Sequence, residues 1–205
     1  MINKEISMIM PDAHLIEINR NELALRLKTE RGYTSPQLEA CKNRLLDVIS
    51  YKCAYIRIPV DLSKTGVCIF DFAEVQSRDL YKNLSGCKEV YVMALTTGIA
   101  VDRLLARLNV VSQAEHFMTD ALSSAAAESF CDYVCKILTR DTKCVPRFSP
   151  GFGDLSITLQ KPLLARLDAV NNLGITLNSA YLMTPVKSIT AFMGIKGNKN
   201  DEEGL

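Results

Sequence analysis

The segment EVYVMAL, which spans residues 89–95, is the most strand-like stretch in this sequence of 205 residues. Its β-branched and aromatic side chains form a short apolar run, and such a run is typical of a buried strand. Alternating apolar and polar residues predict a strand over 51–60, and shorter runs predict strands over 68–72, 177–183 and 188–195.

The helices are predicted from capping residues and from apolar side chains that recur at helical spacing. Asn19 is positioned to cap one helix, and Ser35 followed by Pro36 marks the start of a second helix over 36–51. The longest predicted helix, 113–138, contains an alanine triplet that would let another backbone approach closely. Further helices are predicted over 77–84, 99–108 and 158–169. No internal repeat or low-complexity linker interrupts the pattern, so the sequence favours one α+β unit.

The charge balance argues against a nucleic-acid binder. The chain carries 24 Lys and Arg residues against 23 Asp and Glu residues, a net charge of +1, so it lacks the positive field that attracts a phosphate backbone. No apolar run reaches the roughly 20 residues that cross a bilayer, and Met1–Met10 has no signal-peptide layout. We therefore expect a cytoplasmic protein without nucleic-acid or membrane partners.

The cysteines and histidines offer little metal chemistry. Seven cysteines contain no C-x-x-C pair, and neither His14 nor His116 has a Cys or His at metal-ligand spacing. Reduced cysteines that fill core positions are the expected role, and no metal site is predicted.

The loop from Pro146 to Asp154 has a composition that suggests binding. Its glycines and prolines restrict the backbone while leaving N–H groups free, and Arg147 has the planar fork that grips a carboxylate. Glu128, in the preceding helix, is a carboxylate that could receive an amine. Together these residues form a minimal site for a zwitterion. The alternative is a helix connection in which Arg147 makes only a stabilising salt bridge.

Three linked segments resemble the activation domain of cobalamin-dependent methionine synthase. RFSPGFGD at 147–154 resembles the R-x-x-x-G-Y loop of that family, and 120–128 resembles its long alanine-rich helix with an embedded Glu. Downstream, LGITL at 173–177 and MTPVKSI at 183–189 resemble a third segment of the family. The likeness covers roughly residues 90–195 in the right order and is greatest to free-standing activation subunits.

The resemblance implies an α+β fold with a curved, mostly antiparallel sheet and helices packed on it. Strands 89–95, 177–183 and 188–195 would lie in one sheet, with helix 113–138 packed near it. The chain would divide into an N-terminal α/β lobe over 1–90, an activation-domain-like core over 91–195 and a disordered tail over 196–205.

The resemblance also implies a binding site for S-adenosylmethionine. Arg147 would hold the carboxylate of its methionine part, and Glu128 would line the same cleft. The backbone at Ser149 and neighbouring loop atoms, including Gly151, would contact the nucleoside. Phe152 occupies the place of a tyrosine that faces the corrin ring, so it would keep an aromatic lid without the hydroxyl.

The function implied is reactivation of a cobalamin-dependent methionine synthase. The chain would bind S-adenosylmethionine and cap cobalamin carried by a partner chain, the cobalamin-binding methionine synthase subunit, for reductive remethylation. A reductant protein would be a further partner. The chain has no cobalamin-binding motif and no zinc-ligand set, so we do not expect it to make methionine alone. The alternatives are a non-catalytic interaction protein that caps another corrinoid protein and an independent small-molecule methyltransferase.

Overall fold

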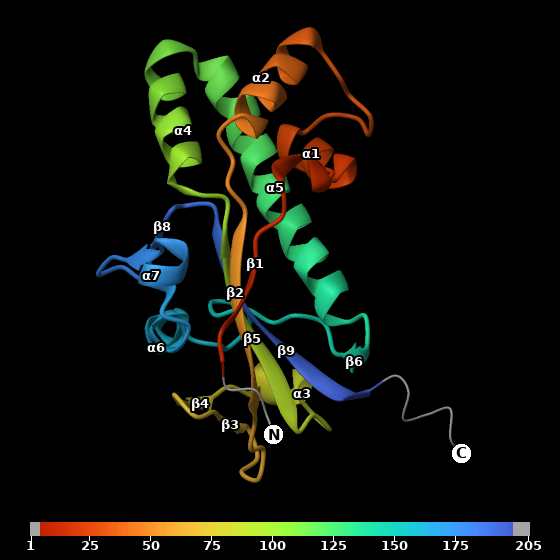
Figure 1. The fold of residues 1–205 in the computed structure, drawn as a ribbon, viewed down its shortest axis with the longest axis vertical. Coiled ribbons are helices and arrows are strands. Elements are labelled where there is room, and N and C mark those ends of the chain that lie inside the picture. Colours follow the sequence, from red (N-terminus) through yellow and green to blue (C-terminus); the bar gives the residue numbers. More distant parts are fainter. Residues whose placement is uncertain (1–4, 199–205) are drawn as a thin grey trace.

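The computed structural model describes residues 5–198, and its centre is a five-stranded sheet (Figure 1). The strands lie in the spatial order β1 (Ser7–Ile9), β2 (Lys52–Pro59), β5 (Glu89–Thr96), β9 (Ser188–Asn198) and β6 (Thr142–Cys144). Each neighbouring pair is antiparallel. The predicted α+β fold with a mostly antiparallel sheet is therefore confirmed, and the central strand is the one predicted from EVYVMAL.

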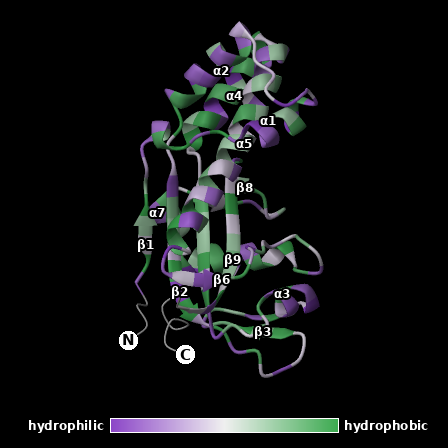
Figure 2. Ribbon diagram, turned by 90° about the vertical axis from the view of Figure 1, so that its right-hand side faces the viewer, coloured by the Kyte–Doolittle hydropathy of each residue, from purple (hydrophilic) through white to green (hydrophobic). Residues whose placement is uncertain are grey.

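Strand β5 is buried on both faces because the sheet separates two hydrophobic cores. Val90 and Val92 belong to one core, whereas Tyr91 and Met93 belong to the other. Side chains alternate between faces along a strand, so an unbroken apolar run supplies both cores at once. The neighbouring strands β2 and β9 mix hydrophobic and more polar residues (Figure 2), and their buried hydrophobic side chains belong to the same two cores.

Helix α5 (Gln113–Leu138) covers one face of the sheet. Its alanines at 121, 125 and 126 are buried in the same core as Met93 and Ala191, and their small side chains allow a close approach. Three further helices gather around the N-terminal half of α5 beyond the end of the sheet (Figure 1). They are α1 (Arg20–Leu27), α2 (Pro36–Leu46) and α4 (Ile99–Val111), and a 3-10 turn, η1 (Ala13–Leu15), precedes them.

The predicted helix starts are confirmed by their hydrogen bonds. The side chain of Asn19 accepts the backbone N–H groups of Asn21 and Glu22, and Ser35 accepts that of Leu38. These caps replace the partners that the first turn of a helix lacks.

The other face carries shorter elements around a second core. They are the hairpin β3 (Val67–Ile69) and β4 (Glu74–Gln76), α3 (Arg78–Asn83), η2 (Ile157–Leu159), α6 (Gln160–Arg166), α7 (Ala169–Leu173), and the hairpin β7 (Thr176–Leu177) and β8 (Met183–Thr184). Leu80, Leu163 and Leu173 bring α3, α6 and α7 into this core.

The predicted strand over 177–183 is wrong. Residues 176–177 and 183–184 pair with each other in a separate two-stranded sheet. The reason is a turn closed by Asn178, whose side chain accepts the backbone N–H groups of Ala180 and Leu182, with Tyr181 at a φ of 59°. An asparagine side chain that bonds its own backbone two residues on reverses the chain and ends the strand.

Other boundaries differ from the prediction by smaller amounts. Helix α2 ends at Leu46, not at residue 51, and the predicted helix over 158–169 is divided between η2, α6 and the start of α7. Strand β9 runs three residues beyond 195, because Lys143 and Thr142 of β6 pair with Gly197 and Asn198. The rest of the predicted tail, 199–205, lies outside the described residues. The division of the chain at residue 90 stays a prediction.

We predict that Val92→Thr lowers the free energy of unfolding by about 1–3 kcal/mol, because it buries a hydroxyl without a hydrogen-bond partner. Val92 is fully buried in β5, whereas Val110 on α4 is 86% exposed. Val110→Thr is thus the matched control, with an expected change below about 0.5 kcal/mol. Urea unfolding of both variants measures the difference, and equal midpoints would contradict the assignment of β5 to the centre.

Candidate functional site

The loop that begins at Pro146 is fixed to strand β9 where it enters. Phe148 exchanges two backbone hydrogen bonds of 2.8 Å with Phe192, and the N–H of Val145 donates to the carbonyl of Gly194 at 2.9 Å. These bonds flank Arg147, so the backbone that carries its side chain is held against the sheet.

The far end of the loop is fixed to helix α3 by the carboxylate of Asp154. It accepts the hydroxyl of Ser77 and the backbone N–H groups of Arg78 and Asp79, the latter two at 2.8 and 3.2 Å. The hydrogen bond from Ser77, together with these N–H groups, holds the pKa of Asp154 below its ordinary value of 3.8. The loop is therefore anchored at both ends to regular elements.

Between these anchors the chain turns through two glycines with positive φ angles. Gly151 has φ +92° and Gly153 has φ +53°, a region that side chains with a Cβ rarely adopt. A Cβ on Gly153 would also lie 2.4 Å from the Asp79 carboxylate. The glycines of this loop shape the backbone, and Phe152, which stands between them, is 66% exposed.

Arg147 points to helix α5 and pairs with two carboxylates there. Its Nη2 donates to Glu128 Oε2 at 2.9 Å, and its Nη1 donates to Asp132. Glu128 and Asp132 are one turn apart, so both lie on the face of α5 that meets the loop. Burial lowers the pKa of Arg147, but the hydrogen bond to Asp132 and the negative charge around the guanidinium outweigh burial and raise it. The salt bridge of the alternative interpretation is therefore present.

The loop, α5 and the end of the sheet enclose a cleft of about 380 Å³. Four of the five predicted site residues line it, namely Glu128, Arg147, Ser149 and Phe152, whereas Gly151 shapes the turn behind them. The other lining residues are Phe148, Pro150, Gln160, Met183, Ser188, Ile189 and Thr190. The cleft thus combines one cation, one carboxylate, an exposed aromatic ring and apolar walls, and its volume lies within the range of about 300–1,000 Å³ typical of small-molecule sites.

Two polar residues that bear on the site are absent from the predicted set: Asp132, which pairs with Arg147, and Gln160, which lines the cleft. The sequence does contain a signal for Asp132, because this residue follows Glu128 by four positions and so shares its helical face. The sequence contains no such signal for Gln160, because only the tertiary fold brings the start of α6 to the cleft. Gln160 is 6% exposed, and its Oε1 atom has no hydrogen-bond partner among residues 5–198. A buried acceptor without a partner is unusual in a folded protein.

The same face of α5 carries two thiols, Cys131 and Cys135. Cys131 is buried and Cys135 is half-buried, and all seven cysteines are free, as expected. The hydrogen bond from the Cys131 thiol lowers the pKa of Cys135 below its ordinary value of 9.0, and although burial opposes this shift, the charge of Arg147 adds to it. The pKa of Cys131 is correspondingly raised, first by that hydrogen bond and then by burial.

Residues 5–198 contain no group of three or more His, Cys, Asp or Glu side chains that could hold a metal ion. Within that range there is also no helix with the length and hydropathy needed to cross a membrane.

The comparisons with known proteins give a likeness of fold. No family model and no curated protein sequence matches the chain. Among solved structures, the chain matches the crystal structure of the MetH reactivation domain bound to AdoHcy, with a TM-score of 0.72 and 12% sequence identity. The match covers 94% of this chain and 79% of that one. The chain therefore has the fold of the MetH reactivation domain.

We predict that Cys135 is alkylated by iodoacetamide with a pH midpoint below 9.0, because a lowered pKa places the reactive thiolate at lower pH. Arg147→Gln should move this midpoint upward, since it removes a positive charge that stabilises the thiolate. Mass spectrometry of the labelled peptide measures the rate at each pH, and Cys135→Ser identifies the peptide signal. A midpoint at or above 9.0 in the unsubstituted protein would show that the thiol pair is not polarised by its surroundings.

Proposed function

We propose that the chain binds S-adenosylmethionine in the cleft and serves as the reactivation module of a cobalamin-dependent methionine synthase. The observation that carries the proposal is the convergence of Glu128, Arg147, Ser149 and Phe152 on one cleft, in a fold shared with the MetH reactivation domain. That domain was solved with AdoHcy bound, which supports a ligand of the same class here.

The ion pairs of Arg147 fit an amino-acid ligand. Such a ligand brings a carboxylate and an ammonium group together. The ligand carboxylate would replace Glu128 on Nη2 of Arg147, and the released Glu128 would accept the ammonium group. Asp132 would remain on Nη1 and keep the guanidinium in place. Neither the protein groups nor the carboxylate and ammonium group of the ligand are left without a partner in either state, which matters because an unpaired charge in a partly buried site is costly.

The net charge of the cleft favours S-adenosylmethionine over AdoHcy. Glu128, Asp132 and Arg147 together carry one net negative charge. AdoHcy is neutral overall, whereas S-adenosylmethionine has an additional positive charge on its sulfonium. Because opposite charges attract more strongly in a site with limited solvent, the methyl donor would bind more tightly than the demethylated product.

The rim of the cleft supplies an apolar surface toward a partner. Phe152 is 66% exposed, and Leu182, next to the lining residue Met183, is 63% exposed. Exposed apolar side chains beside a cleft mark surfaces that another molecule covers. We infer that this rim meets the cobalamin of the partner chain, which supplies the cobalt that accepts the methyl group. The residues of this chain would bind the methyl donor and exclude water.

A reconstitution experiment tests the proposed function. A cobalamin-dependent methionine synthase without its own reactivation domain is oxidised to its inactive form and mixed with this protein, S-adenosylmethionine and a one-electron reductant. We expect methionine formation to resume with the unsubstituted protein and not with Arg147→Ala. If turnover does not resume although the protein binds S-adenosylmethionine, the proposal is wrong. Binding to a different corrinoid protein would then support the alternative of an interaction protein.

Arg147→Ala should weaken the binding of S-adenosylmethionine about thirtyfold, because a charge-assisted contact of this kind contributes about 2 kcal/mol. Arg147→Lys should restore little of the affinity, since an ammonium group lacks the planar fork. Calorimetric titration measures the affinity, and thermal melts measure stability in parallel.

The matched control for Arg147 is Arg166→Ala. Arg166 donates two hydrogen bonds of 3.0 Å to Asp71 outside the cleft, so its loss removes an ion pair without touching the site. If Arg147→Ala behaves like this control, with a lower melting temperature and unchanged affinity, then Arg147 has only a structural role.

A further inference from the structure

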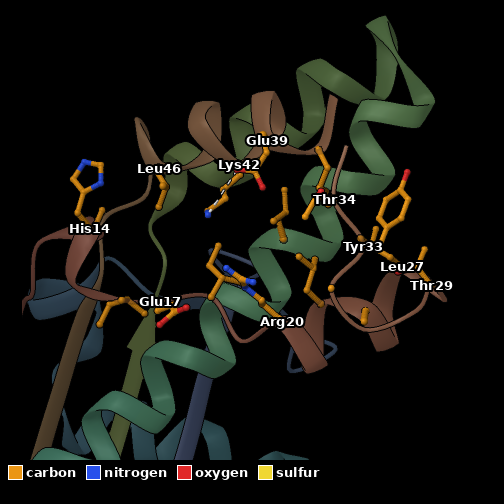
Figure 3. Close-up of a pocket in the computed structure, with 18 residues that line it drawn as sticks. His14, Glu17, Arg20, Leu27, Thr29, Tyr33, Thr34, Glu39, Lys42 and Leu46 are labelled. Atoms are coloured by element: carbon orange, nitrogen blue, oxygen red, sulfur yellow. Dashed lines mark ion pairs between the residues drawn. The ribbon is translucent and has the colours of Figure 1, made fainter. Parts of the chain in front are cut away.

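A second cavity, of about 320 Å³, lies among the helices around the N-terminal half of α5. It shares no lining residue with the cleft. Helices α1 and α2 both pack on α5, and the cavity lies between them, with segment 13–18 on one side (Figure 3). The proposed function makes no use of it.

The inner wall of this cavity is apolar. Ile18, Leu27 and Leu38 line it and are each at most 8% exposed, and Leu122 of α5, which also lines it, is fully buried. Filling such a space with a hydrocarbon chain removes apolar surface from water on both partners, which favours binding.

Two cations reach the same cavity from different helices. Figure 3 shows the guanidinium of Arg20, from α1, and the ammonium of Lys42, from α2, projecting into the space between the helices. Arg20 makes no ion pair or side-chain hydrogen bond with any residue in 5–198. Lys42 has only the weak ion pair with Glu39, at 3.9 Å, and the carboxylate of Glu17 also lines the cavity. Glu39 lines the cavity too, so two carboxylates accompany the two cations there. Arg20 is the cation without a counterion among them, and an anionic group beside Arg20 and Lys42 would supply one.

We propose that this cavity binds a small amphipathic anion, with its apolar chain against Leu27, Leu38 and Leu122 and its carboxylate or phosphate head between Arg20 and Lys42. The proposal stands independently of the cleft and of the function proposed for it. It predicts a preference set by two properties of the ligand, namely the sign of the head group and the length of the chain.

Octanoate and octyl phosphate are the probes for the two head groups, and octylammonium is the control of opposite charge. We expect one or both anions to bind with a dissociation constant of about 0.1–1 mM, and octylammonium to bind at least about tenfold more weakly. Isothermal titration of the full chain measures all three. The stronger of the two anions identifies the head group. Equal binding of octylammonium and the anions would overturn the proposal, as would no binding of either anion.

Three variants locate the site. Lys42→Gln and Arg20→Gln should each weaken the better anion about fivefold to tenfold, because each removes a charge-assisted contact. Thr34 is exposed and lines the cavity, so Thr34→Trp should fill the space and abolish binding. Lys82→Gln, which changes an exposed lysine on α3, is the control with unchanged affinity.

Competition separates this cavity from the cleft. Saturating AdoHcy should leave the affinity for the anion unchanged, whether or not AdoHcy itself binds. If AdoHcy displaces the anion, or if Thr34→Trp binds it normally, the anion occupies another site and the proposal is wrong. A failure of reconstitution with the synthase would leave this result unaffected.

Discussion

Burial of strand β5 on both faces is the constraint on which the rest of the molecule depends. A strand whose side chains are all apolar and buried from Val90 to Leu95 cannot lie at the surface, so it requires a covering layer on each side. Helix α5 covers one face, and α3, α6 and α7 cover the other. Every residue of β5 pairs with β9, and β9 in turn holds the loop that carries Arg147. The position of the cleft therefore follows from the central strand through two sets of backbone hydrogen bonds.

The loop of the cleft is anchored by contacts within the protein itself. Backbone bonds to Phe192 fix its start, and the Asp154 carboxylate fixes its end to the first turn of α3. Glu128 and Asp132 fix the guanidinium of Arg147 from a third direction. Binding a ligand to groups that are already ordered costs less conformational entropy than ordering them at the time of binding. A cleft built in this way can hold a small zwitterion with few direct contacts.

The elements that were predicted correctly are those that form through interactions between residues close together in the sequence. The caps at Asn19 and Ser35 and the apolar run of β5 act through neighbouring residues, and each was placed correctly. Strands β1 and β6 have only three residues each and form because a longer strand pairs with them. Their own sequences therefore contain no pattern that predicts a strand. The turn at Asn178 depends on a side-chain hydrogen bond that competes with strand formation. In the cleft, Arg147 and Glu128 were predicted, whereas Gln160 is brought there by the packing of α6 alone.

The low sequence identity to the MetH reactivation domain agrees with a fold that is determined partly by local sequence signals and partly by tertiary packing. An identity of 12% over 94% of the chain is enough for one fold, because packing requires apolar residues of suitable size at periodic positions and not particular residues. Fold alone does not establish what a protein binds. The proposed function therefore depends on the few positions where one residue type is required. Gly153 stands where a Cβ would meet Asp79, and Arg147 provides a fork that a lysine cannot reproduce. These two residues act on the same loop, since one sets its path and the other supplies its charge.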